Sequence, residues 1–140
     1  MWGTDVAVNQ VLTRLIGGQR AVLGESLVGV YLFGSAAIGS FEPGSSDIDT
    51  VVLLREDLAA PRLAALDILH TQIIRETPEW TDRIEAVYLS TRALETSLWG
   101  PAPAARISPG EDFHAIEVDP RWILDWSLGA ASWLGLSLAV

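Results

Sequence analysis

Two apolar runs joined by a turn-rich connector constrain the fold of this chain most strongly. The first run covers Val28–Phe33 and the second covers Ile48–Leu54, with a connector rich in glycine, serine and proline between them. Apolar runs of this length, bounded by Gly and Pro, are typical of buried β-strands. The sequence therefore predicts two buried strands with an irregular connection between them.

Two acidic residues mark the start of the second run. Asp47 and Asp49 flank Ile48, and side chains alternate between the faces of a strand, so both carboxylates should lie on the face opposite Ile48. Without a partner, carboxylates this close repel each other, and one tends to retain its proton. A divalent cation removes that conflict, and Mg²⁺ prefers one or two carboxylates together with substrate phosphates. The pair predicts a magnesium site.

The end of the first run supplies residues suited to phosphate. Gly34 lets the backbone approach a ligand closely. Ser35 offers a hydroxyl and an amide at the start of a short helix predicted for residues 36–38, where amide groups point outward. We expect Gly34 and Ser35 to bind phosphate groups, with Ser46 as an additional nucleotide-binding candidate.

A third acid lies on a third predicted strand, Arg83–Leu89. On this strand Glu85 shares a face with Val87 and Leu89. A carboxylate on an apolar face is unusual unless it has a partner. Glu85 therefore either lies in water on an edge strand or completes the acidic site, and we adopt the second interpretation.

Gly34-Ser35, followed after eleven residues (36–46) by Asp47-Ile48-Asp49, resembles the signature of nucleotidyltransferases of the DNA-polymerase-β-like superfamily. The longer string, Tyr-Leu-Phe-Gly-Ser-Ala through Ser-Ser-Asp-Ile-Asp, is most similar to aminoglycoside adenylyltransferases that act on streptomycin and spectinomycin. The resemblance implies transfer of AMP from ATP to an aminoglycoside hydroxyl. It also implies two Mg²⁺ ions bound by Asp47 and Asp49 together with Glu85, and β- and γ-phosphates held by Gly34 and Ser35. In the streptomycin-type enzymes the residue that matches Glu85 acts as the general base.

Composition limits the classes of partner. The net charge is −9, and all nine basic residues are arginine. An acidic surface argues against general nucleic-acid binding and suits a cationic small molecule such as an aminoglycoside. The 140 residues contain no cysteine, which excludes disulfides. The N-terminus does not have the pattern of a secretory signal, and no apolar run is long enough for a membrane span, so we expect a cytoplasmic protein without a membrane partner.

The remaining patterns complete an α/β prediction: a small, mixed, twisted sheet backed by helices, with the site at one end of its strands. A helix should begin at Asp5 or Asn9 and run toward Ile16, and Gly24 should end that segment. A second helix should cover residues 59–76. We expect His70 and His114 to be structural rather than ligands. Three further elements are predicted: a loop over Trp99–Asp112 that either covers the site or only connects, a strand over Phe113–Val118, and a helix that begins at Asp119-Pro120.

The C-terminal residues depart from the resemblance. It extends to Leu128, so residues 1–128 are predicted to form a nucleotidyltransferase domain, and residues 129–140 an atypical, uncharged apolar tail. Longer family members add a helical domain that forms half of the aminoglycoside cleft. A truncated or frameshifted gene would produce such an end, as would an engineered or incomplete chain. Trp122, Trp126 and the tail predict self-association and a weak or absent aminoglycoside activity.

Two other functions remain open from the sequence. A minimal nucleotidyltransferase of a toxin–antitoxin pair has the same Gly-Ser and Asp-x-Asp core, is similarly short, and acts on or binds a protein partner. A non-catalytic remnant would bind nucleotide without transferring it. The long helix over residues 59–76 and the separate Glu85 strand favour the aminoglycoside branch.

Overall fold

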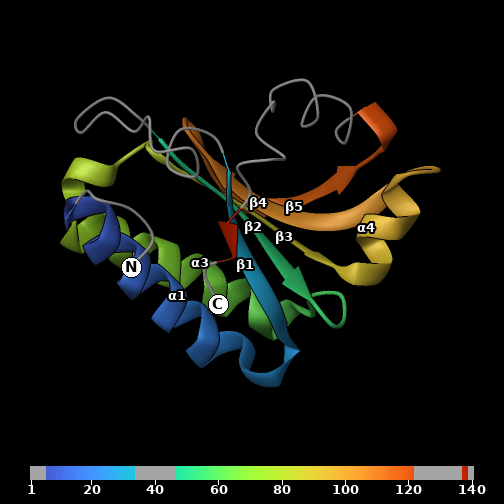
Figure 1. Ribbon diagram of the computed structural model, residues 1–140, viewed down its shortest axis with the longest axis horizontal. Coiled ribbons are helices and arrows are strands. Elements are labelled where there is room, and N and C mark those ends of the chain that lie inside the picture. The colour runs from blue at the N-terminus through green and yellow to red at the C-terminus, as the bar shows by residue number, and fades with distance from the viewer. Residues whose placement is uncertain (1–5, 34–46, 122–136, 139–140) are drawn as a thin grey trace.

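The computed structural model describes residues 6–33, 47–121 and 137–138. These residues form one six-stranded sheet in the order β5-β4-β3-β2-β1-β6 (Figure 1). The strands are β1 (Leu27–Phe33), β2 (Ile48–Leu54), β3 (Ile84–Ser90), β4 (Ala102–Ser108), β5 (Glu111–Val118) and β6 (Ser137–Leu138). The helices are α1 (Val6–Leu23), α3 (Ala60–Glu76) and α4 (Thr91–Ser97), with 3₁₀ turns η1 (Gly24–Ser26) and η2 (Pro78–Trp80). The predicted α/β fold, a mixed sheet backed by helices, is confirmed.

Strand direction in the sheet follows from the connections. β2 and β3 run parallel, and the other neighbouring pairs are antiparallel. Parallel neighbours need a crossover, which α3 provides between β2 and β3. Pro61 lies in the first turn of α3, where its missing N–H costs nothing, and the helix ends at Thr77 before Pro78.

The two faces of the sheet are covered differently. One face packs against α1 and α3 and forms the main core, which includes the fully buried Leu12, Leu66 and Val52. The other face carries a smaller cluster in which Val87 packs near Ala93 of α4. Because α4 begins directly after β3, it covers the C-terminal end of that strand. The acidic residues of β2 and β3 lie toward the opposite end.

Helix α1 is longer than the sequence predicted. It continues through Gly17-Gly18 to Leu23, and Gly24, with a φ of 53°, ends it as expected. The helix persists because its buried stripe continues on the far side of the two glycines. Gly18 also allows α3 to approach closely, since a Cβ at this position would overlap with the side chain of Leu69.

The prediction of a loop over Trp99–Asp112 is wrong. This segment contains β4, which forms a hairpin with β5 through a turn at Gly110, where φ is 78°. Helix α4 was not predicted either. The prolines in this segment were the reason for predicting a loop. Pro103 is tolerated in β4 because the first half of the strand pairs only with β5, so no second strand requires a hydrogen bond from its missing N–H. The strand predicted from Phe113 is the main part of β5.

The C-terminal part of the chain is described only in places. Asp119 accepts a hydrogen bond from the backbone N–H of Arg121 at 2.9 Å, as expected of a residue that caps a helix starting at Pro120. Ser137 and Leu138 pair with Leu32 and Tyr31 of β1. Trp122, Trp126 and the rest of the tail lie outside the described residues, so the division at residue 128 stays a prediction. No described helix has the length and apolar character needed to cross a membrane.

Candidate functional site

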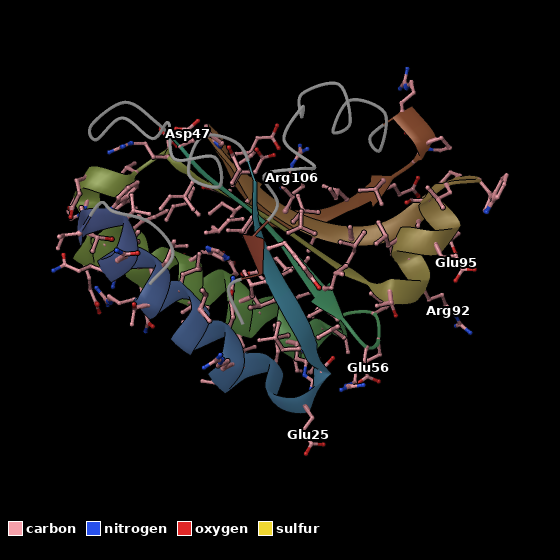
Figure 2. All side chains as sticks on the ribbon, viewed as in Figure 1. Glu25, Asp47, Glu56, Arg92, Glu95 and Arg106 are labelled. Atoms are coloured by element: carbon pink, nitrogen blue, oxygen red, sulfur yellow. The ribbon has the colours of Figure 1, made fainter. Side chains whose placement is uncertain are left out.

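The acids of β2 and β3 come together at one end of the sheet. Asp49 and Glu85 are register partners on the two parallel strands, so their side chains are neighbours on the same face. Ile48 is fully buried in the main core on the opposite face. Asp47, directly before β2, is half-buried and lies at the same end of the sheet (Figure 2). The structure therefore assembles the three carboxylates from two strands that are separated by α3 in the sequence.

The pKa values of Asp49 and Glu85 are both raised above their ordinary values. Burial and the neighbouring charge of Glu85 raise the pKa of Asp49 to about 7, and a hydrogen bond from the Asp49 carboxyl to Glu85 adds to this shift. Burial also raises the pKa of Glu85, although the hydrogen bond from Asp49 and the positive charge of Arg106 act in the opposite direction. Asp47 adds repulsion to both groups. The conflict predicted between Asp47 and Asp49 is thus strongest between Asp49 and Glu85.

The donor chemistry of this site suits a divalent cation. Among residues 6–33, 47–121 and 137–138, no group of three His, Cys, Asp or Glu side chains is already arranged around a metal position. Nevertheless, Asp49 and Glu85 place two carboxyls side by side, and the raised pKa of Asp49 reflects the cost of burying a second negative charge there. Carboxylate oxygens are the ligands that Mg²⁺ prefers, so the residues fit this ion in kind.

The outer strands contribute charged side chains near the carboxylates. On β4, Arg106 is the register partner of Val87 and therefore lies on the same sheet face as Glu85. Its Nη2 donates to Glu111 Oε2 at 2.9 Å. Arg106 was not among the predicted site residues, because its strand was predicted to be a loop. The available signal was one arginine within an otherwise small and apolar stretch.

The phosphate-binding prediction lies outside the described residues, because Gly34, Ser35 and Ser46 are not among them. The described residues on either side of positions 34–46 are Phe33 and Asp47. Phe33, the last residue of β1, is the register partner of Asp49, and Asp47 precedes β2. Phe33 and Asp47, the described residues on either side of positions 34–46, therefore lie at the acidic end of the sheet.

A mostly apolar cavity lies elsewhere on the molecule. A cavity of about 580 Å³ is bounded by the N-terminal half of α1 and by η2, and its lining is mostly apolar. Asn9, Arg14 and Glu79 supply polar atoms there, but Asp47, Asp49 and Glu85 are not part of its lining. We place the candidate site at the carboxylates, because the neighbouring acids Asp49 and Glu85, with Asp47 close enough to act on their charges, carry chemistry that this cavity lacks.

The three acids also fall inside a recognised sequence family. A family model described as "Nucleotidyltransferase domain" matches residues 20–99, more than half of the chain, and the match covers β1, β2 and β3 with all three acids. The chain belongs to the nucleotidyltransferase domain family. The family resemblance on which the sequence analysis relied is thereby confirmed.

One solved structure supports the fold of this nucleotidyltransferase. Spectinomycin adenyltransferase AAD(9) from Enterococcus faecialis, solved with ATP and spectinomycin, matches with a TM-score of 0.54 at 16% sequence identity. The match covers 87% of this chain and 45% of the other, so this nucleotidyltransferase spans less than half of that protein's length. No curated protein is similar enough in sequence to match.

Proposed function

We propose that this nucleotidyltransferase transfers AMP from Mg-ATP to a hydroxyl group of an aminoglycoside. The observation that carries the proposal is the in-register pair of Asp49 and Glu85, with Asp47 beside it, inside the matched nucleotidyltransferase domain. The acceptor class is suggested by the structural neighbour, which was solved with ATP and spectinomycin. A net charge of −9 suits a cationic acceptor.

The three carboxylates would divide the work. Asp47 and Asp49, together with Glu85, would hold Mg²⁺, which supplies charge neutralisation at the phosphates when it is bound. Glu85 would take the proton of the acceptor hydroxyl, and burial, which raises its pKa above the ordinary value, makes it a stronger base than a solvated carboxylate. The hydroxyl oxygen then forms a bond to the α-phosphorus as the bond to the β-phosphate oxygen breaks, and pyrophosphate leaves. Gly34, Ser35 and Ser46 would hold the phosphates. A reaction that consumes ATP is expected in the cytoplasm.

The proposal is tested by incubating the purified chain with Mg²⁺ and α-labelled ATP in the presence of streptomycin, spectinomycin or kanamycin. We expect label on streptomycin or spectinomycin together with released pyrophosphate. Label on a co-purified protein alone would favour the toxin–antitoxin alternative. Nucleotide binding without label on any acceptor would point to the non-catalytic remnant.

Glu85→Gln gives the matched test of the base. Transfer should fall by roughly 10²–10⁴-fold, because general-base assistance is typically of that size, while Mg-ATP still binds. Glu95→Gln, on the distant helix α4, serves as the control and should leave transfer unchanged (Figure 2). Isothermal titration with Mg-ATP separates loss of binding from loss of chemistry. Unchanged turnover of Glu85→Gln would show that Glu85 is not the general base.

A further inference from the structure

Arg106 is the one arginine in a described strand; the other eight lie in helices, turns and strand ends. Its register partner on β3 is Val87, two residues beyond Glu85. Diagonal neighbours on antiparallel strands lie about 7–8 Å apart, within the reach of a long side chain. The charge of Arg106 accordingly acts on Glu85. Figure 2 shows Arg106 at the same end of the sheet as Asp47.

Glu111 anchors the guanidinium from the next strand. Arg106 Nη2 lies 2.9 Å from Glu111 Oε2, and Ser108 also hydrogen-bonds to Glu111. His114 Nε2 is 3.8 Å from the same oxygen. Three residues of the β4–β5 hairpin thus surround the Glu111 carboxylate and restrict where the guanidinium can lie.

Part of the guanidinium remains available for another acid. An arginine has five N–H donors in a rigid fork, and the hydrogen bond to Glu111 uses one of them, on Nη2. The Nε–H of Arg106 is buried and has no acceptor among the described residues. The Arg106 side chain is 27% exposed, so its charge is only partly screened by solvent. The Nε–H of Arg106 is thus a buried donor without a described partner on the sheet face that carries Glu85, and it could interact with that carboxylate.

We propose that Arg106 is a positioning residue that holds the Glu85 side chain in place from β4, while Glu111 anchors Arg106 from β5. This inference rests on the proposed function only for its effect on transfer. Glu85 must remain close to the acceptor hydroxyl although Asp47 repels it, and a fixed positive charge on the β4 side offsets that repulsion. Arginine suits this task because it remains charged and its fork is rigid.

Kinetics of variants separate positioning from phosphate binding. Arg106→Gln should lower kcat by about 10–100-fold, the usual effect of losing a residue that orients a ligating or reacting group. The KM values for ATP and for streptomycin should change by no more than about twofold, and Arg106→Lys should recover part of the loss because it keeps the charge without the fork. A large rise in the KM for ATP with kcat preserved would overturn the proposal, because Arg106 would then bind a phosphate directly.

An exposed ion pair at the other end of the sheet supplies the control. Arg62 Nη1 lies 3.3 Å from Glu56 Oε1, and Figure 2 shows Glu56 far from Asp47. Arg62→Gln should leave both kcat and KM unchanged. Glu111→Gln should reproduce part of the Arg106→Gln defect, since the anchor is lost but the charge remains. Equal effects of Arg62→Gln and Arg106→Gln would show a general charge effect and contradict positioning.

A double-mutant cycle with Glu85→Gln gives a readout that does not need transfer activity. Arg106→Gln should lower the Tm of the metal-free protein by a few degrees, and this loss should shrink by at least about half in the Glu85→Gln background. Undiminished loss in that background would overturn the proposal, because Arg106 would then stabilise the protein without acting on Glu85. If the wild-type chain transfers AMP to no acceptor, the proposed function fails, but the Tm cycle still decides whether Arg106 holds Glu85.

Discussion

At the scale of single residues, the neighbouring carboxyls of Asp49 and Glu85 affect both the stability of the fold and the proposed metal site. The two carboxylates are register partners, and their partial burial reduces the screening of their repulsion by water. In the absence of metal, the folded protein therefore favours one protonated carboxyl. Binding of a cation between the two carboxylates would remove their repulsion and so stabilise the folded protein.

Asp49→Asn should stabilise the metal-free protein while abolishing Mg²⁺-dependent transfer. The pKa of Asp49 in the folded state is about 7, above its ordinary value of 3.8. The folded state therefore binds this proton more tightly, and ionisation of Asp49 lowers stability as the pH rises from about 4 to about 7. Thermal melts in EDTA should show a higher Tm than wild type at pH 8 and little difference at pH 4.

Asp67→Asn, an exposed site on α3, is the matched control and should change neither property. Asp47→Asn should also abolish transfer, since the proposed metal would lose a ligand. Near-normal transfer by either Asp47→Asn or Asp49→Asn would contradict the two-metal mechanism. A Tm gain that is the same at pH 4 and pH 8 would show that charge repulsion is not its cause.

At the scale of elements, α1 and α3 depend on a close approach at Gly18. Gly18→Ala should be less stable than Gly17→Ala by about 1–3 kcal/mol, because the new methyl group would overlap with Leu69 of α3. A Cβ added at Gly17 would meet nothing within 4 Å, so its change to alanine should stabilise the helix by about 0.5–1 kcal/mol. Urea unfolding of the two variants measures this difference. Equal stability of both variants would mean that Leu69 can move aside at no cost.

A buried polar chain joins α1, α3 and β3 in the main core. Gln19 Nε2 donates to Tyr88 Oη at 2.8 Å, which leaves the Tyr88 hydroxyl proton for His70 Nε2 at 2.7 Å. His70 also stacks on Phe113 of β5, with ring centroids 5.7 Å apart. The prediction that His70 is structural rather than a ligand fits this placement, because its ring is 1% exposed.

Protonation of His70 should destabilise the fold in mild acid. Burial lowers its pKa to about 4 from an ordinary 6.5, so the unfolded state binds the proton first. Stability contributed by the neutral ring is complete above about pH 6.5 and is lost as the pH falls toward 4, on the order of 3 kcal/mol in total. The difference in unfolding free energy between wild type and His70→Gln should therefore shrink from pH 7 to pH 4. The exposed His114→Gln serves as the control, and the same pH trend in both variants would contradict this role.

At the scale of the whole molecule, the C-terminal residues determine whether copies of the chain associate with one another. We predict that the full chain self-associates through its uncharged tail, because burial of large apolar side chains contributes about 1.5–3 kcal/mol each. Light scattering of the full chain and of a version ending at Leu128 tests this, and the shorter version should be the more monomeric. The pairing of Ser137 and Leu138 with β1 allows the opposite result. If the tail only completes the sheet, the full chain should be monomeric and the shortened one should associate through the bared β1 edge.

Much of the central sheet could be predicted from local patterns. β1, β2, β3 and α3 were predicted within one or two residues, because their apolar periodicity and their Gly and Pro boundaries are properties of short segments. Alternation predicted a shared face for Asp47 and Asp49, and this stays a prediction because Asp47 lies just before the first residue of β2. The roles of these acids and of Glu85 remain predictions, since no ligand is present and Gly34, Ser35 and Ser46 lie outside the described residues.

Other features were decided only by tertiary contacts. Helix α1 continues past Gly17-Gly18 because its buried stripe packs on α3 and the sheet, which outweighs the weak helix propensity of glycine. β4 forms despite its prolines because β5 pairs with it, and that pairing brings Arg106 to the acidic face. The sequence alone determined which residues could form strands and carry acids. The register that places Asp49 beside Glu85, and Arg106 diagonal to it, required the folded sheet, because pairing between distant segments depends on how their faces pack together.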